Sequence, residues 1–364
     1  MTKRVYNFAP GPATLPLSVL QRVQEELLDF QGLGASIIEI SHRSPEFEKL
    51  LKETEQLFRE VMHVPDNYKV VFCHGGGQLQ FSMVPFNLIG LKPAKKALYV
   101  VSGLFSERAA EESEKYGTVK IVASSKDTNY DRIPALDPKS IEPDASYLHI
   151  TTNNTVMGTR WQKFPATNGV PLVGDATSEI LSREIDVRQF GLLFAGAQKN
   201  VGPAGLAVEI VREDLLGHVH PHTPKMLSYT QLAKDGSLTN TVNTFAIYVS
   251  NLVLQWLKNE GGVAAIEKVN EKKAARVYQV LDRSGGFYKG HAQKEHRSTM
   301  NVTFTLPSAE LLAKFLKESN AAGLYALKGH ARLGGIRASM YNAMPLAGAE
   351  ALASFMEEFQ RKNG

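Results

Sequence analysis

The sequence predicts an α/β protein in which a large domain on a mostly parallel sheet precedes a smaller α+β domain. Short apolar runs separated by helical stretches indicate the sheet, and they span 70–73, 97–101, 119–122, 147–150, 171–174, 192–195 and 206–211. Several runs lack the apolar–polar alternation of a half-exposed strand, as expected for strands that are covered on both faces. The length of 364 residues agrees with two or three domains of about 150 residues each.

The remaining elements follow in chain order. Residues 1–16 are expected to form an ordered arm or tether, because three prolines after Phe8 restrict the backbone and remove hydrogen-bond donors. Helical spacing of apolar residues predicts helices over 17–28, over 45–62 after the N-cap Ser44, and over 244–258. We expect the large domain to cover 17–260 and the small domain to cover 261–364, with the boundary at Gly261.

Composition excludes several classes of protein. Hydrophobic residues make up 43% and charged residues 21% of the chain, which excludes wholesale disorder. The formal net charge is only +4 and like charges do not cluster, so neither nucleic acid nor an anionic membrane is an expected partner. The single cysteine, Cys73, excludes an intrachain disulfide framework and a cysteine-rich zinc site, and no metal site is expected.

Targeting signals are also missing from the sequence. The start of the chain lacks the apolar core of a signal peptide. No uncharged apolar run reaches the roughly 18 residues that a membrane helix needs. These features, with a single cysteine that is compatible with a reducing compartment, predict a cytoplasmic protein.

A glycine-rich turn is the first candidate for chemistry. Gly75, Gly76 and Gly77 follow an apolar strand and open a helix. Free N–H groups at such a helix N-terminus form a ready phosphate site, although a simple tight turn explains the same residues. The turn matches neither a P-loop nor the dinucleotide-binding fingerprint, so it is a weak signal by itself.

Lys199 and Asp175 make that signal more specific. Each directly follows a predicted strand, and ligands bind at the carboxyl ends of strands in open α/β sheets. The two side chains could form a structural ion pair, or Lys199 could simply face solvent. They could equally hold two ends of one cofactor, the lysine through a Schiff base and the aspartate through a protonated ring nitrogen. Together with a phosphate on the glycine turn, this second interpretation favours pyridoxal phosphate.

The sequence also resembles a known protein family over essentially its whole length. The sequence resembles the phosphoserine aminotransferases, a family of fold-type-I pyridoxal-phosphate enzymes. The segment Ala195–Gly205, which reads Ala-Gly-Ala-Gln-Lys-Asn-Val-Gly-Pro-Ala-Gly, is the most specific part. Further matching segments are 7–12, 40–44, 75–77, 153–155, 180–183, 240–241 and 334–343.

The resemblance implies a role for each cofactor residue. Lys199 would form the Schiff base and move the substrate proton, Asp175 would keep the ring nitrogen protonated, and Phe105 would stack on the ring. Thr155 would contact the ring oxygen, and the phosphate would bind to a set that includes two residues of a second subunit, which makes the protein a homodimer. That set is Gly77, Gln78 and Gln198 of one chain with Asn240 and Thr241 of the other.

The resemblance also implies a substrate site. Arg337 would bind the substrate α-carboxylate through two parallel hydrogen bonds. His42, Arg43 and His330 would approach the distal group of the substrate. The implied reaction exchanges an amino group between L-glutamate and 3-phosphohydroxypyruvate, which gives O-phospho-L-serine and 2-oxoglutarate in serine biosynthesis.

Three positions depart from the family pattern. Phe105 stands where relatives usually place tryptophan, and Gln78 stands where some carry arginine. The segment Gly329-His330-Ala331-Arg332 replaces the usual Gly-His-Arg, so one expected arginine is absent or displaced to Arg332. Fewer cations could weaken the binding of a phosphorylated substrate, or Arg332 and Arg43 could compensate.

Other functions remain as alternatives. A fold-type-I aminotransferase with a different, non-phosphorylated substrate is the strongest, because of Ala331. A desulfurase needs a mobile cysteine, whereas Cys73 lies in an apolar strand run. A non-catalytic phosphate-binding module would use the glycine turn but leaves Lys199 and Asp175 unexplained, and a scaffold protein would have no chromophore.

Overall fold

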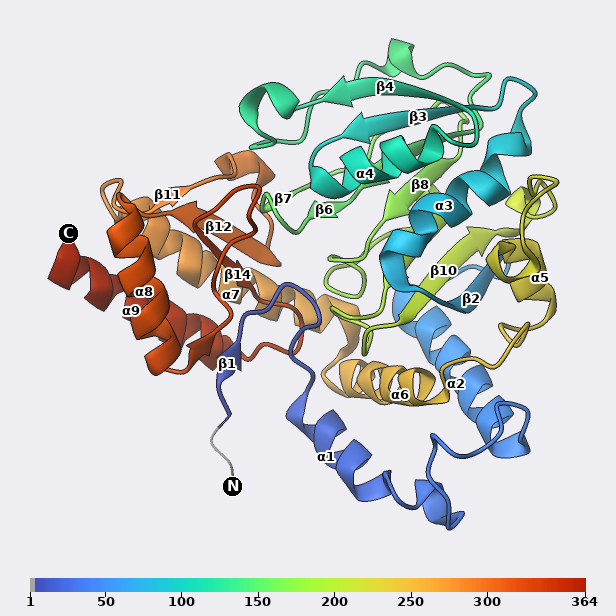
Figure 1. Ribbon diagram of the computed structural model, residues 1–364, viewed down its shortest axis with the longest axis horizontal. Coiled ribbons are helices and arrows are strands. Elements are labelled where there is room, and N and C mark those ends of the chain that lie inside the picture. Colours follow the sequence, from blue (N-terminus) through green and yellow to red (C-terminus); the bar gives the residue numbers. More distant parts are fainter. Residues whose placement is uncertain (1–3) are drawn as a thin grey trace.

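A seven-stranded sheet forms the centre of the protein, as the computed structural model shows for residues 4–364 (Figure 1). Its strand order is β2-β10-β9-β8-β5-β3-β4. The strands are β2 (Tyr68–His74), β3 (Lys96–Val101), β4 (Thr118–Ser124), β5 (Tyr147–Thr151), β8 (Leu172–Asp175), β9 (Leu192–Gly196) and β10 (Leu206–Arg212). All seven coincide with the predicted apolar runs, and β10 alone runs antiparallel to its neighbours in this sheet. The predicted, mostly parallel sheet is confirmed.

Helices cover both faces of the sheet, which explains why its inner strands are apolar on both sides, whereas the edge strand β4 is partly exposed. The helices α1 (Leu17–Glu26), α2 (Pro45–Met62) and α6 (Thr244–Asn259) pack on one face. The helices α3 (Gly76–Leu88), α4 (Leu104–Ser113) and α5 (Tyr229–Lys234) pack on the other, and Figure 1 shows α3 and α4 crossing in front of the strands. Helix α2 begins as predicted, because Ser44 Oγ accepts a hydrogen bond from the Phe47 amide.

The C-terminal elements surround a third apolar core beside the large sheet (Figure 1). They are α7 (Gly262–Arg283), β11 (Lys289–Gly290), β12 (Asn301–Thr305), α8 (Ala309–Ala321), β13 (Leu324–Tyr325), β14 (Ile336–Ser339) and α9 (Leu346–Asn363). Strands β11, β12 and β14 form an antiparallel sheet. Gly261 lies at the turn between α6 and α7 with a φ of 95°. The division of the chain into domains at this turn stays a prediction.

The N-terminal arm is an ordered part of the structure. Strand β1 (Tyr6–Asn7) pairs in parallel with β13, and Phe8 is fully buried in the C-terminal core. The chain then crosses to the large sheet, where the Ala13 amide donates a hydrogen bond of 3.0 Å to the carbonyl of Gln198. The division of the chain into an arm over 1–16 and a following domain stays a prediction, and residues 1–3 lie outside the described part of the chain.

The short elements complete the description. Strands β6 (Asn153–Asn154) and β7 (Thr159–Arg160) form a hairpin directly after β5. Short 3₁₀ helices occupy the connections Phe30–Gly32, Ile89–Leu91, Lys126–Thr128, Pro138–Ser140, Val187–Gln189, Glu213–Leu215, Lys225–Leu227 and Lys294–His296. Within residues 4–364, no helix combines the length and the apolar character that a membrane crossing requires.

Candidate active site

The carboxyl ends of five parallel strands meet at one edge of the large sheet. These strands are β2, β3, β5, β8 and β9. A cavity of about 220 Å³ lies at this edge, and its lining includes Gly77, Phe105, Thr155, Asp175, Lys199 and Arg337. The structure therefore brings together residues that lie up to 260 positions apart in the chain, as expected for a ligand site of an open α/β sheet.

Lys199 is the buried cation of this cavity. Its side chain donates a hydrogen bond of 2.6 Å from Nζ to Thr155 Oγ1, and the residue is 7% exposed. Burial lowers the pKa of Lys199 to about 8, while the nearby Asp175 carboxylate acts in the opposite direction. The neutral, nucleophilic form of the amine is therefore far more populated near neutral pH than in an exposed lysine, and it becomes the main form in mildly basic solution.

Asp175 is the buried anion of the same cavity. It is the last residue of β8, and its Oδ1 accepts a hydrogen bond of 3.0 Å from the Thr177 amide. Burial raises the pKa of Asp175, whereas hydrogen bonding from Thr177 and the charge of Lys199 lower it. A carboxylate in this position can bind a cationic ring nitrogen that lies in the cavity.

Glycine residues allow the chain to pack closely where β2 passes into α3 at the edge of the cavity. Gly75 and Gly76 have φ values of 92° and 66°, which side chains rarely adopt. A Cβ on Gly77 would lie 2.7 Å from Thr177 Oγ1, and a Cβ on Gly196 would lie 2.7 Å from the Gly77 nitrogen. The backbone N–H groups at the start of α3 can thus approach an anion closely, as a phosphate requires.

Gln198 and Gln78 line the cavity at the same place. The buried Oε1 atom of Gln198 has no hydrogen-bond partner among the described residues. Buried polar atoms are almost always paired, so an unpaired amide oxygen beside a glycine-lined space indicates a polar ligand. Gly77, Gln78 and Gln198, which the resemblance assigned to the cofactor phosphate, therefore lie together.

Phe105 lies at the start of α4 with its ring beside Lys199. The ring centroid is 5.7 Å from Lys199 Nζ. The turn before Phe105 is fixed, because Ser106 Oγ accepts hydrogen bonds of 3.0 Å from the amides of Ser102 and Gly103. The ring is therefore held at the cavity, where it can stack on a planar ligand.

Arg337 supplies a second buried cation, from the middle of β14. It is 7% exposed, its Nε has no hydrogen-bond partner, and it forms no ion pair within residues 4–364. Burial lowers its pKa, as expected for a guanidinium that lacks a carboxylate partner. Such a group is suited to bind the carboxylate of a ligand through two hydrogen bonds.

His330 also lines the cavity, on the loop before β14. Its Nδ1 accepts a hydrogen bond of 3.1 Å from the Arg332 amide. Burial and the positive charges of Arg337, Arg108 and Arg332 lower the pKa of His330. The neutral ring therefore carries its proton on Nε2, which can donate to an anion.

The other expected site residues do not line the cavity of this chain. Arg332 is exposed and its guanidinium lies 3.4 Å from Glu107. Arg43 is near Asp235 instead. Hydrogen bonding from Gln231 is the main cause that lowers the pKa of Asp235, and the positive charge of Arg43 adds to it. The other three are His42, Asn240 and Thr241, and the carbonyl of Thr241 lies 3.0 Å from His74 Nε2, beside the glycine turn.

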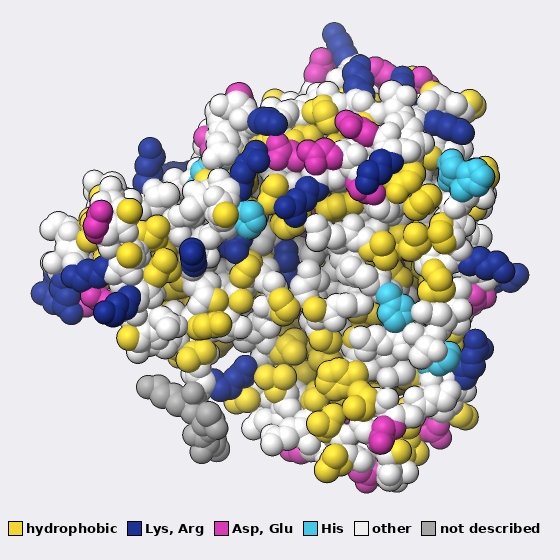
Figure 2. Space-filling model, viewed as in Figure 1, with side chains coloured by type: hydrophobic (Ala, Val, Ile, Leu, Met, Phe, Trp, Pro, Cys, Tyr) yellow, Lys and Arg dark blue, Asp and Glu magenta, His cyan; other side chains and the backbone are white. Residues whose placement is uncertain are grey.

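Basic side chains mark the mouth of the site on the surface. Figure 2 shows Lys and Arg side chains together with a His between α4 and the C-terminal sheet, with acidic side chains nearby. No group of three or more His, Cys, Asp or Glu side chains that could hold a metal ion occurs in the described part of the chain. The cations that line this cavity therefore favour an organic anion.

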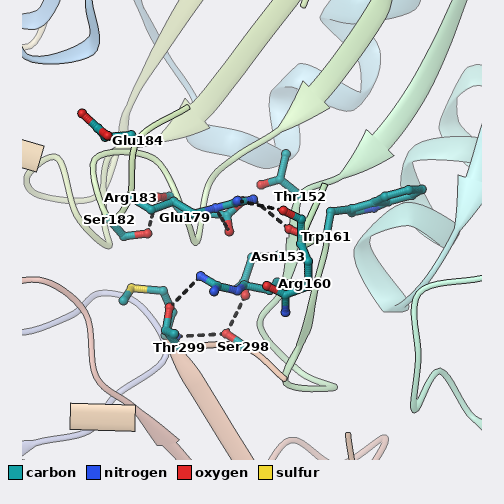
Figure 3. A network of polar contacts seen from close by, with 12 residues as sticks. Thr152, Asn153, Arg160, Trp161, Glu179, Ser182, Arg183, Glu184, Ser298 and Thr299 are labelled. Carbon is teal, nitrogen blue, oxygen red and sulfur yellow. Dashed lines mark hydrogen bonds and ion pairs between the residues drawn. The ribbon is translucent and has the colours of Figure 1, made fainter. Parts of the chain in front are cut away.

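Sequence reasoning missed several residues that support the site. Asn153 is a cavity residue whose Nδ2 donates hydrogen bonds of 2.8 Å to Ser178 and Asn301 and whose Oδ1 accepts one from Ser298. Figure 3 shows this contact within a wider network, in which Arg183 donates to Glu179 and to the carbonyl of Trp161. The position of Asn153 just after a strand end could have indicated its role.

The N-terminal arm contributes the other missed residues. Pro10 and Gly11 line the cavity, and a Cβ on Gly11 would lie 3.2 Å from Lys199 Cγ. The carbonyl of Pro10 accepts a hydrogen bond of 2.8 Å from the Tyr341 hydroxyl. The arm therefore forms one side of the cavity. In the sequence, the glycine within residues 7–12 was the one indication that this segment approaches another part of the chain closely.

The donor set fits a planar cofactor that carries an aldehyde, a ring nitrogen and a phosphate. Lys199 can hold the aldehyde carbon, Asp175 the ring nitrogen, and the glycine turn with Gln198 the phosphate. Phe105 can cover the ring. These are the functional groups of pyridoxal phosphate, and the unpaired Gln198 amide oxygen in the cavity agrees with a polar ligand there.

Comparisons with known proteins agree with this geometry. Residues 5–352 match the model of the family described as aminotransferase class-V. The phosphoserine aminotransferase of Geobacillus kaustophilus is 52% identical over 360 residues, which cover 99% of each chain. The phosphoserine aminotransferase of Lysinibacillus sphaericus is 49% identical over 363 residues, which cover 100% of each chain.

Solved structures show the same fold. A phosphoserine aminotransferase from Bacillus circulans subsp. alkalophilus has a TM-score of 0.96 and 44% identity over 100% of both chains. A phosphoserine aminotransferase from Trichomonas vaginalis, solved with bound pyridoxal phosphate, has a TM-score of 0.92 and 36% identity over 97% of this chain and 100% of that one. The expected fold-type-I architecture is thereby confirmed, and this chain belongs to the class-V aminotransferase family.

Proposed function

We propose that this protein transfers an amino group between L-glutamate and 3-phosphohydroxypyruvate and forms O-phospho-L-serine and 2-oxoglutarate in serine biosynthesis. Pyridoxal phosphate is its cofactor. The observation that carries this proposal is the pair Lys199 and Asp175 at one buried cavity, in a chain 52% identical to a relative named for this activity. A transaminase runs its two half-reactions at one site, so both substrates use the same residues.

The cofactor supplies, when bound, an aldehyde that takes up the amino group and a ring that delocalises negative charge. Lys199 would hold that aldehyde carbon between turnovers, because its lowered pKa makes the amine available as a nucleophile. The same amine, once a substrate amine has displaced it, would take up the proton of the substrate Cα and hold it at Nζ. Thr155 keeps Nζ in place through its 2.6 Å hydrogen bond.

Asp175 keeps the ring nitrogen protonated, which is what allows the ring to accept negative charge. Its own buried position makes the contact strong, because few water molecules compete for the carboxylate. Phe105 would cover the ring, and Gly77, Gln78 and Gln198, which line the cavity, would bind the phosphate through amide groups. These contacts would hold the cofactor ring in position beside Lys199.

Arg337 binds the α-carboxylate that glutamate and phosphoserine share. Its buried guanidinium has no protein carboxylate to bind, so the substrate provides the missing partner. His330 lies on the distal side with a free Nε2 proton. The two residues together orient the substrate so that its Cα hydrogen faces Lys199.

The active protein is a homodimer in which each site takes residues from both chains. His42, Arg43, Asn240 and Thr241 lie outside the cavity of their own chain, in agreement with a role in the partner's cavity. Four large apolar residues between α1 and α2 are exposed, namely Leu27 by 38%, Leu28 by 85%, Leu33 by 43% and Ile38 by 61%. A second subunit would cover them. We place this dimer in the cytoplasm, because the single free Cys73 is compatible with a reducing compartment.

Mixed dimers test the shared site. Lys199→Ala and Arg43→Ala should each be inactive or nearly so as homodimers. If Arg43 acts in the partner's site, dissociated and reassembled mixtures should regain about a quarter of the wild-type activity, since half of the dimers then hold one intact site. An unchanged activity after mixing, in dimers shown by native mass spectrometry to be mixed, would contradict a shared site.

A different substrate is the second candidate, and one contact favours it. Arg332, the residue that could replace the missing arginine at position 331, is paired with Glu107. The decisive measurement compares kcat/KM for O-phospho-L-serine with kcat/KM for L-serine and L-alanine. The proposed function predicts a large preference for phosphoserine, and a ratio near one would exclude it while leaving the transaminase chemistry intact.

The cofactor is tested separately. Purified protein should bind pyridoxal phosphate with a visible absorbance band, and borohydride should fix the cofactor on Lys199, as peptide mass spectrometry can show. The variant Lys199→Ala should give no such peptide. A colourless protein after incubation with pyridoxal phosphate would contradict both candidate functions.

A further inference from the structure

We propose that Arg108 on α4 binds the distal anionic group of the substrate and sets the preference for phosphoserine. The inference rests on the proposed function, and it deepens that function by naming a specificity residue. Neither the motif comparison nor any strand end pointed to Arg108. The observation that does so is the guanidinium carbon of Arg108, which lies 5.9 Å from the ring centroid of the cavity residue Phe105.

Three arginines lie close to His330, and they differ in their partners. Arg337 binds the α-carboxylate in the proposed function, and Arg332 is paired with Glu107 at 3.4 Å. Arg108 is exposed and forms neither a hydrogen bond nor an ion pair with any residue from 4 to 364. Of the three cations that lower the pKa of His330, Arg108 is therefore the one whose charge no protein carboxylate or substrate carboxylate neutralises.

The position of Arg108 fits a ligand in the cavity. Its guanidinium carbon lies 5.9 Å from the ring centroid of Phe105, whose ring is 5.7 Å from Lys199 Nζ. Phe105 and Arg108 are one helical turn apart on α4, so their side chains lie on the same face of that helix. The helix is anchored at its start by Ser106, which limits how far Arg108 can move from the cavity.

Glu107 explains why Arg332 does not serve this function. Its carboxylate accepts a hydrogen bond from the Tyr130 hydroxyl and also lies 3.2 Å from Lys126. Arg332 is thus one of two cations that share a half-buried carboxylate. Glu107 on α4 therefore neutralises the charge of Arg332. The next residue on the helix, Arg108, has no such partner and can bind the ligand.

The chemistry of the substrate matches this arrangement. A phosphate ester carries about two negative charges near pH 7, whereas the γ-carboxylate of glutamate carries one. The neutral His330 donates one hydrogen bond from Nε2, and a guanidinium donates two in a geometry that suits phosphate oxygens. Arg108 therefore adds more to the binding of phosphoserine than to that of glutamate.

The test compares three variants as holoenzymes. We expect Arg108→Gln to lower kcat/KM for phosphoserine by about 10-fold or more and that for glutamate by clearly less. Arg108→Lys should keep part of the preference, because it retains the charge without the two-pronged geometry. Arg188→Gln is the matched control, since Arg188 is an exposed arginine whose partner is Asp186.

A binding experiment gives a readout that does not depend on turnover. 3-Phosphoglycerate has the length and charge of the substrate but no amino or keto group, so calorimetry can measure its Kd directly. Arg108→Gln should raise this Kd about 10-fold and leave the visible spectrum of the bound cofactor unchanged. Equal Kd values for wild type and Arg108→Gln would overturn the assignment.

The outcomes separate this inference from the proposed function. If the wild type prefers phosphoserine and Arg108→Gln keeps the same preference, Arg108 has no such role but the function stands. If the wild type does not prefer phosphoserine over serine, the proposed function itself fails. A larger loss for Arg332→Gln than for Arg108→Gln would also overturn the inference, because it would place Arg332 on the phosphate.

Discussion

The backbone amide of Asn342 donates a hydrogen bond of 3.0 Å to Oδ1 of Asn200, the residue that follows Lys199. Asn342 comes shortly after β14, so this bond joins the strand that carries Arg337 to the residue that carries the reactive amine. Both asparagines also hold one buried turn: Asn200 donates to the carbonyl of Ile180 at 3.0 Å, and Asn342 donates to that of Leu181 at 2.8 Å. Leu181 is buried with a φ of 64°, a conformation that a leucine keeps only when its surroundings impose it.

Replacing Asn342 with alanine should therefore affect stability and activity together. The change leaves the carbonyl of Leu181 without its side-chain donor and removes one of the two acceptors of the Asn270 amide, which should lower the free energy of unfolding by about 1–3 kcal/mol. The backbone hydrogen bond from residue 342 to Asn200 remains, but kcat should also fall, because the buried turn at Leu181 that Asn200 and Asn342 hold together loses one of its two donors. Urea denaturation and steady-state kinetics measure the two effects. The exposed Asn320→Ala is the control, and equal values for both variants would contradict the prediction.

Lys273 holds the same segment from the other side. It is fully buried on α7 with no acidic partner, and its Nζ donates to the carbonyls of Met340, Tyr341 and Met344 at 3.1, 2.8 and 3.0 Å. Burial lowers the pKa of Lys273 to about 7, while the three carbonyls favour its charged form.

Lys273→Met should destabilise the protein by about 2 kcal/mol or more, because three buried carbonyls lose their donor. The neighbouring Lys272 is exposed on the same helix, so Lys272→Met changes the same atoms with little effect. Thermal unfolding of the two variants side by side measures the difference. Comparable melting temperatures would show that apolar packing at position 273 replaces the hydrogen bonds.

The sequence predicts the large sheet well and the surroundings of the site less well. The inner strands were recognisable because helices cover both faces of the sheet and each strand is a short apolar run, and the partly exposed edge strand β4 was recognisable from its apolar residues. Lys199 and Asp175 were recognisable because they directly follow two of those strands. Arg108 and Asn342 could not be identified, because their roles depend on which residues from distant segments meet them. Glu107, for example, forms an ion pair with Arg332 only in the folded protein, where α4 packs beside the loop after β13.

The sequence is equally uninformative about residues that could act in the site of a partner subunit. The motifs around His42, Arg43, Asn240 and Thr241 indicate a function but not the chain on which each residue acts. Their absence from the cavity of their own chain is a property of the folded structure. Spacing in the sequence contains no signal for it, since a residue one loop away can face either its own site or a neighbour's.

Replacing Arg337 should have opposite effects on activity and stability. In Arg337→Met the substrate carboxylate loses two charge-assisted hydrogen bonds, so kcat/KM should fall about 10-fold to 150-fold for both glutamate and phosphoserine. The folded protein loses a buried cation that has no protein partner, so its melting temperature without substrate should rise. A variant that is both less active and less stable would indicate a structural role instead. Arg188→Met, at an exposed ion pair, is the control.

Glu209 predicts a pH dependence of stability outside the active site. It is fully buried on β10, where its Oε1 accepts a hydrogen bond of 3.0 Å from the Cys73 thiol and its Oε2 has no partner among the described residues. Burial raises the pKa of Glu209 to about 8. In the unfolded chain the same carboxyl has a pKa near 4.5, so between these values the folded state binds the extra proton. The free energy of unfolding should therefore fall as the pH rises through that window.

The variant Glu209→Gln removes the titrating group and should remove this slope. The difference in stability between Glu209→Gln and wild type should grow in favour of the variant from pH 5 to pH 8, by up to about 5 kcal/mol over the whole window. Urea denaturation at several pH values measures it. Glu213→Gln, at the exposed ion pair with Lys69 just beyond the same strand, should leave the slope unchanged. Parallel stability curves for Glu209→Gln and wild type would mean that Glu209 is ionised in the folded protein, and that a cation or water reaches it.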